Sequence, residues 1–142
     1  MSHQMMRIIR LIAVLLVVAI VLNDGIRITT AYAQVINGAR DGLDAAAAAV
    51  FTNHNGTNPA RDAVAARGAA LVGYEAKRES NAAAKTAHIR LVAQTTAPGM
   101  IVVGPIMNAS AGVPSSQWWS TAPVIDWNAE RTINLTTGMT IN

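Results

Sequence analysis

The sequence predicts an α+β fold, in which one long N-terminal helix, membrane-embedded and then amphipathic, precedes a short second helix and a small antiparallel β-sheet. An uninterrupted apolar run covers residues 11–22, and no proline occurs before Pro59 to end a helix. From Ile28 to Val50 apolar side chains recur every three or four residues, which is the period of one helix face. After His88 short stretches alternate apolar and polar side chains, as half-buried strands do.

Composition limits both the size of the core and the class of protein. The 142 residues are enough for about one domain. They are 51% hydrophobic and 13% charged, which excludes a charge-rich disordered chain, but 27 alanines bury little area each. The net charge of +3 comes mostly from Arg7 and Arg10, since nine Lys and Arg face eight Asp and Glu from Asn23 onward. We therefore expect no nucleic-acid partner, because binding phosphates requires a basic surface.

The first element is a candidate membrane anchor. Residues 1–10 form a basic cytoplasmic start, and residues 11–22 form the transmembrane core. Twelve apolar residues are fewer than the roughly 20 that a spanning helix needs, but Arg7 and Arg10 can extend toward the headgroups. The same two arginines place the N-terminus in the cytoplasm and the C-terminal domain outside the cell membrane. The anchor side chains are Leu11, Val14, Leu15, Val18 and Leu22.

A cleaved signal peptide is the alternative for this segment. Ala31-Tyr32-Ala33 resembles a cleavage site, and cleavage after Ala33 would release a secreted binding module. Its contact surface would then include Trp118, Trp119 and Trp127. Against cleavage, the stretch between Leu22 and this site is long and contains charges. The helical pattern also continues through the site, so a retained anchor is favoured.

Residues 23–52 continue the same helix as an amphipathic extension. Its apolar side is expected to pack against this chain's own sheet or another subunit, because an exposed apolar stripe of this length is rare. Gly38 and Gly42, four residues apart, would allow a neighbouring element to approach the helix backbone. The expected packing residues are Ile28, Tyr32, Val35, Ala39, Gly42, Leu43 and Ala46.

Residues 53–142 are expected to form a small extracytoplasmic α+β domain. A run of turn-forming residues ends the first helix, and Asn58 with Pro59 begins a second one that reaches about Tyr74. Residues 108–116 are predicted to be a loop. The predicted strands cover 88–94, 100–104, 124–127 and 131–136, with a further candidate at 139–141.

Little in the sequence indicates catalysis. His3, His54 and His88 are scattered, and no spaced carboxylate partner is evident for the latter two. Asp41 and Asp44 share a helix face, which a solvated polar surface explains. The absence of cysteine excludes a thiolate zinc site and a cysteine nucleophile, and no nucleotide-binding motif occurs. We therefore expect no catalytic residue, metal or cofactor. Trp118 and Trp119, in a loop rich in Ser, Gly and Pro, are candidate surface-contact residues or caps of the small core.

About forty residues resemble the N-terminal region of TadE/TadG-like proteins of tight-adherence pilus systems. The matching stretches are Asp24-Gly25-Ile26-Arg27, Gln34-Val-Ile-Asn37 and Asp44-Ala45-Ala46-Ala47. The resemblance implies a pilin-like, membrane-anchored, non-enzymatic component, whose partners are the membrane and either other pilus or secretion subunits or copies of itself. Prepilin processing uses a small residue before the apolar block and a glutamate within it, but here no glycine precedes Leu11 and no glutamate precedes Glu75. This departure from the prepilin pattern favours a minor or accessory component over a major pilin that polymerises.

Overall fold

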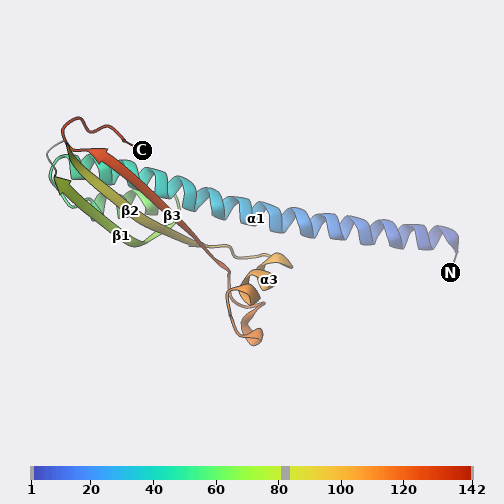
Figure 1. The fold of residues 1–142 in the computed structure, drawn as a ribbon. Coiled ribbons are helices and arrows are strands. Elements are labelled where there is room, and N and C mark those ends of the chain that lie inside the picture. The colour runs from blue at the N-terminus through green and yellow to red at the C-terminus, as the bar shows by residue number, and fades with distance from the viewer. Residues whose placement is uncertain (1, 81–83, 142) are drawn as a thin grey trace. The chain divides into compact units, whose positions relative to one another are not determined.

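The computed structural model describes residues 2–80 and 84–141 and confirms the predicted α+β fold. The described residues form one long helix, two short α-helices, a 3-10 turn and a three-stranded antiparallel sheet (Figure 1). The elements are α1 (His3–Phe51), α2 (Thr57–Ala66), β1 (Ala70–Ser80), β2 (Lys85–Thr96), α3 (Val103–Ser110), the 3-10 turn η1 (Ser115–Gln117) and β3 (Val124–Asn134).

The chain divides into two compact units. The proximal unit contains α1 up to Thr30 and the segment Thr96–Pro123. The sheet unit contains Ala31–Thr95 and the residues from Val124 onward. The segment between β2 and β3 therefore groups with the first part of α1.

In the sheet unit, the strands lie in the order β1-β2-β3. β1 pairs antiparallel with β2 from Ala70 opposite Gln94 to Ser80 opposite Lys85, with one irregularity between Leu71 and Gly73. Between β2 and β3, Arg90 Nε donates to Glu130 Oε1 over 2.8 Å. Gln94 Nε2 likewise donates to Asp126 Oδ1 over 2.8 Å. These pairs give the outer face of the sheet a polar surface.

The core of the sheet unit lies between the second part of α1 and the inner face of the sheet (Figure 1). Alternate residues of β2 are buried, which is the period of a strand with one face covered. Small side chains dominate, so the helix and sheet must approach closely to exclude water. The buried apolar side chains are Ala31, Val35, Ala39, Leu43, Ala46 and Val50 of α1, Ala60 and Val64 of α2, Ala87, Ile89, Leu91 and Ala93 of β2, and Ile125 and Ile133 of β3.

The second helix is shorter than predicted. α2 ends at Ala66 instead of near Tyr74, because Gly68 takes a left-handed conformation with φ of +84°. The N–H of Ala69 donates to Val64 O and that of Gly68 to Ala65 O, so the last carbonyls of the helix are satisfied. Residues 70–74 then belong to β1 instead of the helix.

The strand assignments after β2 also need correction, while the predicted strand 88–94 lies within β2. The predicted strand 100–104 is wrong, since α3 begins at Val103 and extends into the predicted loop 108–116. The predicted strands 124–127 and 131–136 form the single strand β3. At 139–141 there is only an isolated bridge between Thr140 and Ile133.

Candidate functional site: the membrane anchor and the segment bound to it

The first part of α1 exposes its apolar side chains. Among the described residues, α1 is the one helix long and apolar enough to cross a membrane, and none of its most apolar 18-residue window is buried inside the molecule. Arg7 and Arg10 precede the apolar run and are exposed. The anchor side chains Leu11, Val14, Leu15, Val18 and Leu22 are between 47% and 59% exposed.

Asp24, two residues after the apolar run, binds the start of α3. Its Oδ1 accepts the backbone N–H of Ile101 over 2.7 Å. Its Oδ2 accepts those of Val102 and Val103 over 2.8 and 2.9 Å. The side chain is only 2% exposed. A carboxylate in this position satisfies N–H groups that have no partner within the helix and also meets the positive end of its dipole.

The electrostatics of Asp24 follow from these contacts. Burial by itself raises the pKa of the carboxyl group, because it disfavours the charged form. The backbone hydrogen bonds from Val103, Ile101 and Val102 outweigh that effect, and the Asn23 side chain adds to them, so the pKa is lowered to about 2. Asp24 is therefore ionised at neutral pH, and its negatively charged carboxylate holds the start of α3.

The segment Ala97–Pro123, called the connection below, closes on itself. The N–H of Ala97 donates to Pro123 O over 2.9 Å, which brings its two ends together. Buried Asn108 then donates from Nδ2 to the carbonyl oxygens of Trp118 and Thr121 over 3.0 and 2.7 Å. The connection is thus an ordered segment between β2 and β3, held together by its own hydrogen bonds.

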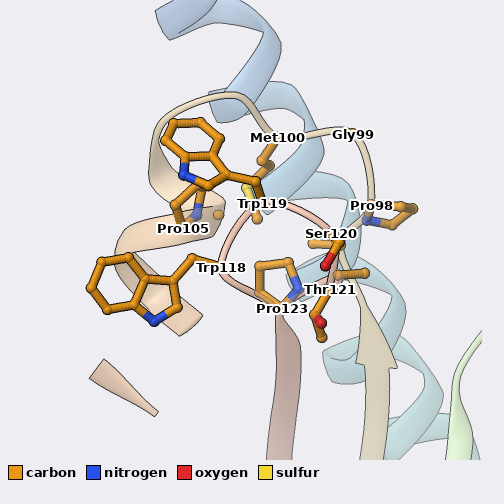
Figure 2. Close-up of a pocket in the computed structure, with 12 residues that line it drawn as sticks. Pro98, Gly99, Met100, Pro105, Trp118, Trp119, Ser120, Thr121 and Pro123 are labelled. Carbon is orange, nitrogen blue, oxygen red and sulfur yellow. The ribbon is translucent and has the colours of Figure 1, made fainter. Parts of the chain in front are cut away.

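The two tryptophans of the connection differ in their surroundings. Trp118 is half-buried and donates from Nε1 to Val113 O over 2.7 Å. Trp119 is 74% exposed, so it does not cap a core. Both line a shallow pocket of about 130 Å³ with Met100 and Pro105 (Figure 2). Trp127 lies in β3 of the sheet unit, so the three tryptophans are divided between the two units.

Most of the expected packing residues are buried in α1. Val35, Ala39 and Ala46 have no exposed surface, Leu43 is 6% exposed, and Gly42 is buried. Ile28 is half-buried in the proximal unit, where it lines an apolar groove. Tyr32 differs from the expectation.

Tyr32 is 39% exposed, and its neighbour Ala31 is 2% exposed. The buried side of α1 therefore passes through Ala31 instead of Tyr32. A tyrosine at the margin of a packed stripe keeps its hydroxyl group hydrated, while an alanine fits where the elements approach closely.

Gly42 lies closer than Gly38 to the elements packed against α1. A Cβ atom placed there would lie 2.8 Å from Val64 Cγ2 and 3.2 Å from Leu91 Cδ2. At Gly38 the nearest atom, Val64 O, would lie at 3.5 Å, an ordinary contact distance. Of the two glycines, only Gly42 occupies a space that a side chain cannot enter without displacing its neighbours.

The polar residues that the sequence singles out form ion pairs within the sheet unit. Asp41 Oδ2 lies 2.6 Å from Arg67 Nε, and Asp44 Oδ1 lies 2.6 Å from Arg131 Nη1. These pairs join the polar side of α1 to the end of α2 and to β3.

His88 has a carboxylate partner, which sequence reasoning missed. Its Nε2 lies 3.5 Å from Glu130 Oε2, and its Nδ1 lies 2.9 Å from Thr132 Oγ1. Cross-strand pairing brings these residues together, so the sequence spacing carries no signal of it. Within residues 2–80 and 84–141, no group of three His, Asp or Glu side chains could hold a metal ion.

Sequence reasoning also missed the roles of Asp24 and Asn108. Asp24 carried a signal, since a carboxylate two residues after an apolar run must find partners or water. Its partners lie 77 to 79 residues away, so the pairing itself was not visible. Asn108 gave no signal, because an asparagine before Ala, Ser and Gly is typical of a loop.

Comparison with known proteins identifies no relative of this chain. No protein-family model, no curated protein sequence and no solved structure matches the chain.

Proposed function

We propose that the protein is a single-pass, non-enzymatic component of the cell envelope with a pilin-like architecture. In this proposal residues 11–22 hold it in the cell membrane, with the N-terminus in the cytoplasm and the C-terminal domain outside. It serves as a minor or accessory component of a tight-adherence pilus or a related secretion apparatus. It acts by helix-mediated assembly with other subunits or with copies of itself.

One observation carries the proposal: α1 is exposed and apolar in its first part and packed in its second. The 18-residue window that could cross a membrane has no buried share, so lipid or other helices must cover it. From Ala31 to Val50 the same helix contributes buried side chains to the core of the sheet unit. The same helix, α1, therefore contains both the candidate membrane segment and part of the core of the sheet unit. The role in a pilus comes from the sequence resemblance alone.

The alternative, a binding module released after Ala33, removes residues that the folded chain uses. Cleavage would take away Asp24, which binds the start of α3, and Ala31, which is 2% exposed. It would also leave three N–H groups of Ile101, Val102 and Val103 without their acceptor. These losses favour the retained anchor.

The deciding measurement is the intact mass of the mature protein, isolated from both the membranes and the culture medium of the source organism. A mass equal to the full chain, with or without the first methionine, supports the anchor. A chain that starts at Gln34 contradicts it and favours the secreted module. Retention in the membrane pellet after alkaline carbonate washing provides an independent check, because burial of apolar side chains in lipid is not screened by salt.

The role in assembly requires a separate experiment. A deletion strain is complemented either with the full chain or with residues 34–142 behind a cleavable signal peptide. If helix-mediated assembly is the function, only the full chain restores surface filaments or secretion. Equal restoration by the secreted form would contradict the proposal.

A further inference from the structure

The connection exposes apolar side chains on a surface that has no charge. From Ala97 to Pro123 the sequence contains no Asp, Glu, Lys or Arg. Soluble surfaces normally mix both signs of charge among isolated apolar residues. Here four large apolar side chains are exposed without charged neighbours along the chain: Ile101 at 44%, Val102 at 45%, Ile106 at 59% and Trp119 at 74%.

The contacts of the proximal unit fix where this surface lies along α1. Asp24, which binds the start of α3, is two residues beyond Leu22, or about 3 Å along a helix axis. Val102 and Val103 line an apolar groove of about 440 Å³ together with side chains of the preceding two turns of α1, namely Val17, Ile20 and Val21. The start of α3 therefore lies beside the last turns of the apolar segment.

We propose that the connection lies in the interfacial layer of the membrane, with Ile101, Val102, Ile106 and Trp119 among the lipid headgroups and upper acyl chains. This inference rests on the proposed membrane anchor and adds a second, surface-lying contact to it. The occupant of the exposed apolar face is a phospholipid leaflet.

Three features favour lipid over a second protein. The face continues directly from the candidate membrane segment, through the groove that both line. Tryptophan has an apolar ring and a polar N–H, and it is enriched at membrane interfaces. Arg27 packs against Gly99, where its guanidinium carbon would lie 3.2 Å from an added Cβ, so a cation stands at the base of the connection near the level of the phosphates.

The hydrogen bonding of the connection also suits a poorly hydrated environment. Backbone N–H groups without partners are costly near hydrocarbon, and the start of a helix normally leaves several of them. Asp24 accepts the three N–H groups from Ile101 to Val103. Asn108 binds two carbonyl oxygens of the following loop from a buried position.

The test uses the full chain, whose lack of cysteine makes any introduced thiol unique. A nitroxide is attached to Ile106→Cys, and to Ser80→Cys at the exposed end of β1 as the control. Each protein is reconstituted into phosphatidylcholine vesicles and floated on a density gradient. Collision rates with oxygen, which concentrates in lipid, and with a water-soluble nickel chelate then measure depth. Trp119→Cys serves as a second labelled site in case Ile106→Cys alters α3.

We expect the floated Ile106→Cys label to show a several-fold higher ratio of oxygen to nickel collisions than the control, at a depth of about 5–10 Å. A ratio equal to that of the control, in protein that floats, overturns the inference and leaves the anchor intact. Shielding from both reagents indicates a protein partner, such as a second copy, and also overturns it. Failure of the protein to float overturns the anchor and this inference together.

Discussion

Both carboxylate oxygens of Asp24 accept hydrogen bonds, so only the ionised form makes the full set of contacts. Oδ1 accepts from Ile101 N–H and Asn23 Nδ2, while Oδ2 accepts from Val102 and Val103. A carboxamide of the same shape retains only one acceptor and turns an NH2 group toward the remaining donors. The negative charge and the second acceptor therefore both contribute to holding α3.

We expect Asp24→Asn to loosen the start of α3 without unfolding the sheet unit. Loss of a buried, charge-assisted contact costs about 2 kcal/mol locally. The measurement is hydrogen exchange at the amides of Ile101 to Val103, which should become faster. Asp41→Asn is the control, because Asp41 lies in an exposed ion pair with Arg67 that contributes little. Equal exchange at these amides in both variants would contradict this role for Asp24.

The same contact predicts a pH dependence. The pKa of Asp24 is lowered from 3.8 to about 2 in the folded chain, so ionisation favours the folded form. The stabilisation is complete above about pH 4 and is lost as the pH falls toward 2, with a total of about 2 kcal/mol. Protection of the amides from Ile101 to Val103 should decrease over that interval in the native chain. In Asp24→Asn this component of the pH dependence should be absent.

Gly42 and Gly38 offer a matched pair for testing close packing. Gly38→Ala should leave stability unchanged or raise it by up to about 1 kcal/mol, through helix propensity. Gly42→Ala gains the same propensity but pushes its Cβ against Val64 and Leu91. We expect it to be about 1–3 kcal/mol less stable than Gly38→Ala in thermal or denaturant unfolding. Equal stabilities would show that the neighbours of Gly42 yield without cost.

At the scale of the element, α1 was the most predictable part of the chain. Its apolar run, alanine content and helical period all indicated one helix, and the structure places it at His3–Phe51. The end of α2 and the identity of α3 depended on other information. The left-handed Gly68 ends α2, and the Asp24 carboxylate supports the start of α3, so local propensity for a strand at 100–104 was overridden by a long-range contact.

The buried side of α1 predicts a sharp contrast between two alanines. Ala39 has no exposed surface, whereas Ala48 on the same helix is exposed. Ala39→Asp buries an unpaired charge and should destabilise the sheet unit by several kcal/mol, on the order of 3–5. Ala48→Asp should cost less than about 1 kcal/mol. Circular dichroism during thermal unfolding compares them, and similar midpoints would exclude Ala39 from the packed side of the helix.

At the scale of the whole molecule, the proposed function predicts on which side of the membrane each part of the chain lies. The arginines before the apolar segment predict a cytoplasmic N-terminus. A membrane-impermeant maleimide should therefore label Ser80→Cys in intact spheroplasts, and label Ser2→Cys only after lysis. The reverse pattern would invert the proposed topology. Labelling of both sites before lysis would show that the chain does not span the membrane.

Only the parts of the candidate site that lie in one contiguous stretch of sequence were predictable. The anchor residues and the flanking arginines follow from hydropathy and charge order, which are properties of a contiguous stretch. The joining of Asp24 to α3, and of His88 to Glu130, depends on how distant stretches fold together. The spacing of residues in a single sequence carries no signal of such pairings, which only the folded structure reveals.

The hydrogen bond from Ala97 N–H to Pro123 O makes the connection a replaceable part of the fold. β2 ends at Thr96 and β3 begins at Val124, so the connection leaves and rejoins the sheet at one place. A two-residue turn could replace all of it and convert β2 and β3, already neighbours in the sheet, into a simple hairpin. The same excision would strip Asp24 of its three backbone donors, so it requires a neutral residue at position 24. The connection is thus an insert between two neighbouring strands that Asp24 holds to α1. Other sequences can replace it without a change in the sheet.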